Sequence, residues 1–197
     1  MAADAPHPEV WAVRHGETEW SKSGQHTSRT DIDLTPAGEE QARALGSALS
    51  GIRFDLVLSS PMLRSRKTAE LAGFNDFRVD TDLREWDYGS LEGRTTAEIQ
   101  QDLPGWSIWN GPWPQGETAE EVAQRADRVV GALLSSGAEH IVIFSHGHFI
   151  RVLGTRWVGA DSTAGEWLDL DTASVSALGW YRDTKVLRRW NLVPGHL

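Results

Sequence analysis

An arginine and a histidine stand side by side directly after a short apolar run near the start of the chain. Arg14 and His15 follow residues 10–13, and Gly16 comes next, where it would let the backbone turn sharply. A neutral imidazole can attack a phosphoryl group while the neighbouring guanidinium binds the anion, so that the ring nitrogen becomes the covalent carrier. The alternative is a strand end without chemistry, at which His15 is only hydrogen-bonded and Arg14 is only solvated.

Two later segments could add positive charge and hydrogen-bond donors to such a site. Arg64 falls one turn into the helix expected after residues 59–61, and the positive end of that helix would favour an anion. His146 ends a further expected strand, where it could donate to a phosphoryl oxygen or orient the first histidine. The amides of Gly16 and Gly147 could approach a phosphate closely because neither residue has a side chain. Phosphoryl transfer depends mainly on such positioning and charge.

A departing alkoxide also needs a proton, and Glu85 is the candidate general acid. Its apolar neighbours Leu83 and Trp86 could favour the protonated form by excluding water. The alternative for Glu85 is a solvated loop carboxylate. Asp87 and Glu92 in the same loop are interpreted as structural.

Composition narrows the function classes. The 197 residues are 40% apolar and 24% charged, which suits one soluble domain. A net charge of −9 argues against nucleic acid and against anionic membranes as partners, because both need a basic surface. The absence of cysteine excludes disulfides, zinc–thiolate sites and a cysteine nucleophile. No signal-peptide pattern or membrane span is recognisable, so we expect a cytoplasmic protein.

Apolar runs that alternate with amphipathic segments predict an α/β fold, a three-layer α/β/α domain with a mostly parallel central sheet. We expect one domain over residues 1–197, with residues 1–8 as a flexible tail. Ligands of such sheets bind at the carboxyl ends of strands, where His15, residues 59–64 and His146 would meet. The expected strands cover residues 10–13, 55–60, 77–79, 141–144, 173–180 and 186–192. Two expected helices start at Pro36 and at Pro61. Three further expected helices cover residues 95–101, 118–134 and 150–157. The expected loops cover residues 17–33, 83–93 and 103–116.

Five sequence blocks, in this order, resemble the histidine phosphatase superfamily, which has the phosphoglycerate mutase-like fold. They are Arg14-His15-Gly16-Glu17-Thr18, Ser59-Ser60-Pro61 with Arg64, the 85–93 loop, Gly116-Glu117-Thr118 and Ser145-His146-Gly147. The resemblance implies that His15 is the phosphorylated nucleophile and Glu85 the proton donor. It implies further that Arg14, Arg64 and His146 form the phosphate pocket, and that no metal or organic cofactor takes part.

Within that superfamily the chain is more similar to phosphatases than to mutases. The stretch between Glu85 and His146 is shorter than in mutases, and Ser21 replaces a mutase-like asparagine. Residues 20–27 and 84–89 are similar to small actinobacterial acid phosphatases and sedoheptulose bisphosphatases. We therefore expect a metal-independent phosphatase that hydrolyses a small, sugar-type phosphomonoester through a phosphohistidine. A phosphoglycerate mutase-type isomerase and a non-catalytic phosphate-binding protein stay open as alternatives.

The rest of a sugar phosphate would need further contacts, for which the alternative is ordinary loop packing. The candidate substrate-binding residues are Gly16, Ser21, Gln25, Thr27, Tyr88, Gly147, His148 and Arg151.

Three other signals carry less weight. His146 and His148, two apart on an expected strand, could bind a metal with Asp31 and Asp33, but a metal site usually needs three or four converging ligands. The tryptophans of residues 106–113 could form a lid, a docking surface or a cover over the core. A homodimer through a sheet edge or through this loop stays open.

Overall fold

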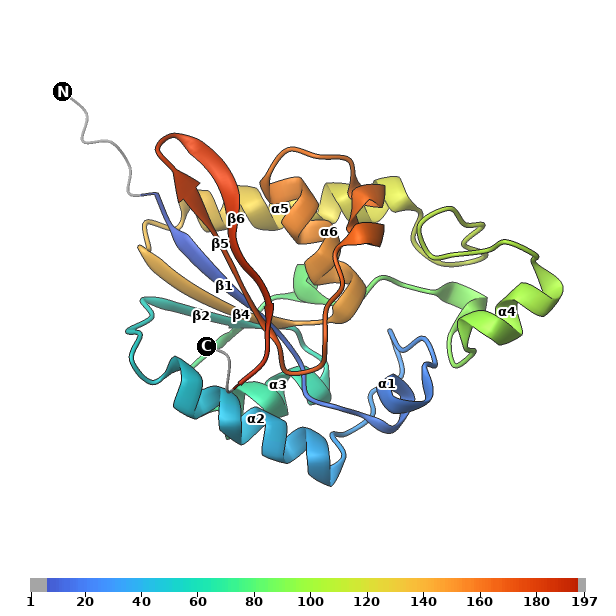
Figure 1. Ribbon diagram of the computed structural model, residues 1–197, viewed down its shortest axis with the longest axis horizontal. Coiled ribbons are helices and arrows are strands. Elements are labelled where there is room, and N and C mark those ends of the chain that lie inside the picture. Colours follow the sequence, from blue (N-terminus) through green and yellow to red (C-terminus); the bar gives the residue numbers. More distant parts are fainter. Residues whose placement is uncertain (1–6, 195–197) are drawn as a thin grey trace.

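A six-stranded sheet between two layers of helices forms the centre of the computed structural model, which describes residues 7–194 (Figure 1). The strand order is β3-β2-β4-β1-β5-β6. The first four of these strands run parallel to one another, β5 pairs antiparallel with β1, and β6 pairs antiparallel with β5. The predicted α/β fold with a mostly parallel sheet is confirmed. The strands are β1 (Glu9–Arg14), β2 (Leu56–Ser59), β3 (Arg78–Val79), β4 (His140–Ser145), β5 (Val175–Tyr181) and β6 (Thr184–Leu192).

Successive residues of the central strand β1 feed two separate cores, because side chains alternate between the faces of a sheet. Val10 and Ala12 pack on the side of α5 (Ala119–Ser135) and α6 (Gly147–Trp157). Trp11 and Val13 pack with α2 (Pro36–Leu49) and α3 (Leu63–Leu71). Burial on both faces explains why β1 is an uninterrupted apolar run.

The helix starts follow local capping chemistry. Thr35 accepts from the backbone N–H of Gly38 at the start of α2, with Pro36 as first helical residue. Thr95 and Thr118 form capping boxes at α4 (Thr96–Asp102) and α5. The other regular segments are α1 (Glu19–Ser23) and the 3₁₀ turns η1 (Thr81–Leu83), η2 (Gly89–Leu91) and η3 (Ser162–Trp167).

Three expectations about local structure were wrong. The expected loop over residues 17–33 contains α1, which Thr18 and Ser21 cap reciprocally. Helix α6 begins at Gly147, three residues before the expected start. Residues 7 and 8 are not a tail, since His7 stacks on the ring of Trp180 at 4.1 Å and Pro8 accepts a hydrogen bond from the same indole. The rest of the expected tail, residues 1–6, lies outside the described residues.

Helices α1 and α4 both lie beyond the end of the sheet at which β1 and β4 terminate (Figure 1). An isolated bridge between Gln25 and Thr95 joins the two segments. The cavity described below opens at this end. Among residues 7–194, the helices are too short or too polar to cross a bilayer.

Candidate active site

His15 follows directly on β1, and its backbone is held from both sides. Its N–H donates to the carbonyl of Ser145, and its own carbonyl accepts from the N–H of Ala173, each at 3.0 Å. The side chain is 5% exposed, and Nδ1 lies 2.8 Å from the carbonyl oxygen of Gly16. Because that oxygen can only accept, Nδ1 carries the hydrogen and Nε2 keeps its lone pair. The imidazole also lines a cavity, so it can act there as a nucleophile.

Arg14, the last residue of β1, lines the same cavity. Its Nη1 donates to the carbonyl of Leu170, whereas its buried Nε has no hydrogen-bond partner among the described residues. Burial lowers the pKa of Arg14 and the nearby Glu85 carboxylate raises it, but a guanidinium remains charged at physiological pH. A half-buried cation with a free donor beside the nucleophile suits a bound anion.

Arg64 and His146 pack behind His15 as a hydrogen-bonded pair. Arg64 Nε donates to His146 Nδ1 at 3.2 Å, and both side chains are fully buried. His146 Nδ1 therefore accepts, so Nε2 carries the hydrogen and donates to Ser60 Oγ at 2.7 Å. With both ring nitrogens engaged, His146 meets the edge of the His15 ring at 5.2 Å between centroids. Of its two expected roles, this arrangement favours orienting His15.

The loop after α1 is tied to Arg64. Arg64 Nη1 donates to the carbonyl of Thr30, and Arg64 Nη2 donates to the carbonyls of Thr27 and Ser28, at 3.2–3.3 Å. Glu92 holds the same loop by accepting from the N–H groups of Ser28 and Thr30. Arg64 thus combines a positive charge beside the histidines with the fixation of one cavity wall.

The two glycines differ from one another. The N–H of Gly16 donates to Thr68 Oγ1 at 3.0 Å, and Gly16 is not among the residues that line the cavity, so its contact with a substrate stays a prediction. The backbone of Gly16 does not have the positive φ that favours glycine, but a Cβ at this position would overlap the backbone of Gly38. Gly147 does line the cavity, and a Cβ there would lie 3.3 Å from the Arg14 guanidinium. Close packing therefore requires glycine at position 16, whereas a Cβ at position 147 would press on the Arg14 side chain.

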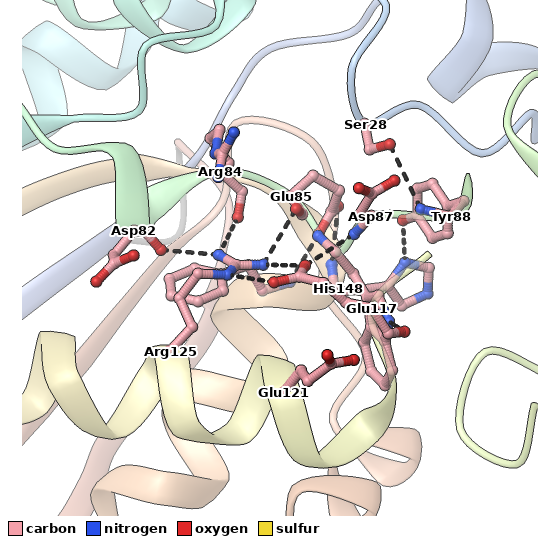
Figure 2. A network of polar contacts seen from close by, with 12 residues as sticks. Ser28, Asp82, Arg84, Glu85, Asp87, Tyr88, Glu117, Glu121, Arg125 and His148 are labelled. Carbon is pink, nitrogen blue, oxygen red and sulfur yellow. Dashed lines mark hydrogen bonds and ion pairs between the residues drawn. The ribbon is translucent and has the colours of Figure 1, made fainter. Parts of the chain in front are cut away.

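Glu85 is 7% exposed and reaches from the 83–93 loop to the start of α6 (Figure 2). Its Oε1 accepts from the N–H groups of Trp86 and Phe149, each at 2.8 Å. Its Oε2 accepts from the N–H of His148 at 3.1 Å. The carboxyl group caps the positive end of α6, and Oε2 has the fewer contacts. Since Glu85 lines the cavity with Arg14 and His15, it is not a solvated loop carboxylate.

The cavity has a volume of about 170 Å³, and its outer wall consists mainly of polar side chains from several segments. Sequence reasoning missed Gly24, His26 and Leu170 in this wall; Gly24 and His26 lie within the 20–27 block but had no role assigned. The candidate substrate-binding residues that line it are Ser21, Gln25, Thr27, Tyr88, Gly147, His148 and Arg151.

Most of this outer wall is uncharged at neutral pH. Burial lowers the pKa of His26 to about 4, and burial, followed by the nearby Arg151, lowers the pKa of His148 well below its usual value. The hydroxyl of Tyr88 lies 2.6 Å from His148 Nδ1, and burial raises its pKa well above the usual value. Arg151 adds one cation, which donates to the carbonyls of residues 165 and 166 and stacks over Trp109 at 4.6 Å.

The side chains considered as metal ligands have other partners. Asp31 accepts from the N–H of Leu63, and Asp33 pairs with Lys67. His146 precedes α6 and His148 lies within it, so they are not alternate residues of one strand. Across residues 7–194, no three histidine or carboxylate side chains come together as metal ligands would.

The tryptophan loop mainly covers the core. Trp106 and Trp109 are buried, and Trp113 packs against the same core. Trp109 meets His148 edge-on at 5.5 Å between ring centroids, so one ring of this loop supports a cavity residue.

The buried histidines should make the fold sensitive to acid. Burial, followed by the positive charge of Arg64, lowers the pKa of both His15 and His146 well below 6.5. In the unfolded chain each imidazole takes up a proton near pH 6.5, so the stability they provide is complete above that pH and is lost as the pH falls.

We therefore expect the free energy of unfolding, measured in urea between pH 6.5 and 5, to fall with a slope that approaches about 1.4 kcal/mol per pH unit for each histidine whose pKa burial lowers, His26 and His148 included. The variant His146→Gln should lose the contribution of one histidine to this pH dependence of the free energy of unfolding. Equal stability at pH 7.5 and pH 5 would contradict the expectation.

Comparison with known proteins agrees with this geometry. Residues 10–193 match the histidine phosphatase superfamily (branch 1). The chain is 40% identical over 178 residues to an acid phosphatase of Mycobacterium tuberculosis, covering 89% of this chain and 88% of the relative. It is 35% identical over 185 residues to sedoheptulose 1,7-bisphosphatase of Saccharomyces cerevisiae, covering 77% and 68%.

Among solved structures, that of an open reading frame of Mycobacterium tuberculosis superposes with a TM-score of 0.91 at 37% identity, covering 95% of this chain and 98% of that one. The resemblance inferred from the five sequence blocks is thereby confirmed. The chain belongs to the histidine phosphatase superfamily.

Proposed function

We propose that this protein is a metal-independent phosphomonoesterase that transfers the phosphoryl group of a small, sugar-type ester to His15 and then to water. The observation that carries the proposal is that one cavity is lined by a neutral imidazole with a free Nε2, a guanidinium and a buried carboxyl group. The relatives named as phosphatases support the same reaction class.

In the first half-reaction His15 Nε2 attacks phosphorus and the ester oxygen departs. Arg14 binds the phosphoryl oxygens, and the charge of Arg64 acts from behind the histidines. Glu85, protonated at Oε2, gives its proton to the departing oxygen, so that the alcohol leaves neutral. Oε2 suits this role because it accepts one backbone N–H, whereas Oε1 accepts two.

In the second half-reaction water attacks the phosphohistidine. Glu85, now a carboxylate, takes a proton from that water, and the phosphorus–nitrogen bond breaks. Inorganic phosphate leaves, His15 is neutral again and Glu85 is again protonated. The cycle consumes one ester and one water and needs no metal ion.

The outer wall supports a hydroxyl-rich leaving group. Ser21, Gln25 and Thr27 offer uncharged polar groups, and His26 and His148 stay neutral at pH 7. Neutral donors and acceptors match sugar hydroxyls, which can both donate and accept. Arg151 is the wall residue that could meet a second anionic group of the substrate.

The test is phosphate release from sugar phosphates, sugar bisphosphates and phosphoglycerates, measured in EDTA. We expect release that chelation does not reduce, with sugar phosphates preferred over phosphoglycerates. Isomerisation of phosphoglycerate with little free phosphate, seen only with a bisphosphorylated primer, would overturn the proposal in favour of a mutase. Phosphate binding without turnover of any compound would overturn it in favour of a binding protein.

A further inference from the structure

The backbone that carries Glu85 is held from behind by the buried side chain of Arg125 in α5 (Figure 2). Arg125 Nη1 donates to the carbonyls of Asp82 and Arg84, at 2.8 and 2.7 Å. Its Nη2 donates to the carbonyl of Glu85 at 3.2 Å. One guanidinium therefore binds three carbonyl groups within four consecutive residues.

Glu117 completes this arrangement by pairing with the other edge of the same guanidinium. Arg125 Nε and Nη2 donate to Glu117 Oε1 and Oε2 at 2.8 and 2.7 Å. All five N–H groups of the planar Arg125 guanidinium are thus used. Lysine could not replace them, since an ammonium offers three donors without a planar arrangement.

Glu117 also binds the far side of the Glu85 loop directly. Its Oε2 accepts from the N–H of Asp87 at 3.0 Å, and its backbone carbonyl accepts from the indole N–H of Trp86 at 2.7 Å. Together Arg125 and Glu117 contact the chain immediately before, at and after Glu85. We call these two residues the clamp.

Removing the charges of the clamp from water costs free energy, which argues that the clamp does more than add stability. The Arg125 side chain is 4% exposed and Glu117 is 24% exposed, and the guanidinium lies 4.5 Å above the ring of Phe149. Taking such a pair out of water often costs more than its attraction returns, whereas a buried pair can specify one conformation. Arg125 also lies on the same apolar face of α5 as Val122 and Val129, where an aliphatic residue would pack.

We propose that the clamp is a positioning device for the proton transfer by Glu85, an inference that rests on the role given to Glu85 in the proposed function. The carboxyl end of Glu85 is held by the N–H groups at the start of α6, and the clamp holds its backbone end. With both ends fixed, Oε2 can move little toward or away from the leaving oxygen. Loss of the clamp should therefore weaken acid catalysis while His15 and Arg14 stay in place.

Leaving-group dependence tests this inference. Nitrophenolate departs without a proton, whereas the alkoxide of glycerol 3-phosphate needs one, so the ratio of kcat/KM for the two esters reports acid catalysis. Because both values scale with the fraction of folded enzyme, their ratio is insensitive to partial unfolding. The value kcat/KM reports the steps up to the phosphohistidine, which include this proton transfer.

Four single variants are compared with the wild type. For Glu85→Gln we expect kcat/KM for glycerol 3-phosphate to fall about 10³-fold further than kcat/KM for nitrophenyl phosphate. For Arg125→Lys and Glu117→Gln we expect a shift of the ratio in the same direction, by roughly 10- to 100-fold, since small misplacements of a catalytic group have effects of that size. The control is Arg128→Gln, which breaks an exposed ion pair of α5 with the side chain of Asp82 and should leave the ratio unchanged.

The double variant Glu85→Gln with Arg125→Lys separates positioning from general damage. If Arg125 acts through Glu85, the second change should shift the ratio less than about twofold in the Glu85→Gln background. A ratio unchanged in Arg125→Lys but shifted in Glu85→Gln, or a full further shift in the double variant, would overturn the clamp proposal. A ratio unchanged in Glu85→Gln itself would instead overturn the acid role in the proposed function.

Discussion

Replacing His15 by alanine is expected to lower kcat by at least about 10⁴-fold, because loss of a covalent nucleophile removes the two-step path altogether. The alanine would leave Arg14 and Glu85 in the cavity, so phosphate should still bind. The fold should persist, since His15 is held mainly through its backbone N–H and carbonyl.

The measurement is rapid-quench trapping of the phosphoenzyme followed by intact-mass analysis. Wild type should carry one acid-labile phosphoryl group and His15→Ala none. A matched control is His148→Gln, which changes another imidazole of the same cavity and should still become phosphorylated. Substantial turnover by His15→Ala, or a phosphoryl group on it, would show that another residue is the nucleophile.

Replacing Arg64 by methionine should reduce both activity and stability. Removing a preorganised positive charge from behind the phosphoryl site, together with the support it gives the cavity wall, should cost about 10²- to 10³-fold in kcat/KM. The carbonyls of Thr27, Ser28 and Thr30 would lose their donor in the interior, so the free energy of unfolding should fall by about 3 kcal/mol or more.

Urea unfolding and nitrophenyl phosphate kinetics measure these two effects. Lys67→Met is the matched control, because Lys67 lies one turn further along α3 and makes surface ion pairs with Asp33 and Glu39. It should change little in either assay. If Arg64→Met kept wild-type kcat/KM, the charge of Arg64 would have no part in the reaction.

The elements with strong local signals could be predicted from the sequence. The apolar run of β1 and the capped, periodic segments of α2 and α5 lie within one or two residues of their expected bounds. Helix α1 lacks an apolar stripe, and the signal it does carry is the reciprocal cap of Thr18 and Ser21. The early start of α6 depends on Glu85, 62 residues before Gly147, and a cap that distant leaves no local pattern.

The candidate site was less predictable than the fold because side-chain partners are set by tertiary packing. The adjacency of Arg14 and His15 indicated their shared position, whereas nothing in the sequence showed that the N–H of Gly16 is bound by Thr68. Glu117, which stands just before α5, binds Arg125, and Thr118 caps the helix with Glu121. An arginine in the apolar stripe of α5 was the signal that could have revealed the clamp.

The two ends of the cavity come from parts of the molecule that differ in how far their sequence can change without disturbing the fold. The inner end is built on β1 and β4, which are paired along their length in the middle of the sheet. One side of the outer wall comes from residues 21–27, which a few contacts join to residues 93–95. An enzyme built in this way can change which alcohol group it accepts by changes in the short segment 21–27, which begins within α1, while its phosphoryl chemistry is inherited intact. A library of variants confined to residues 21–27 is therefore the place to look for altered substrate choice.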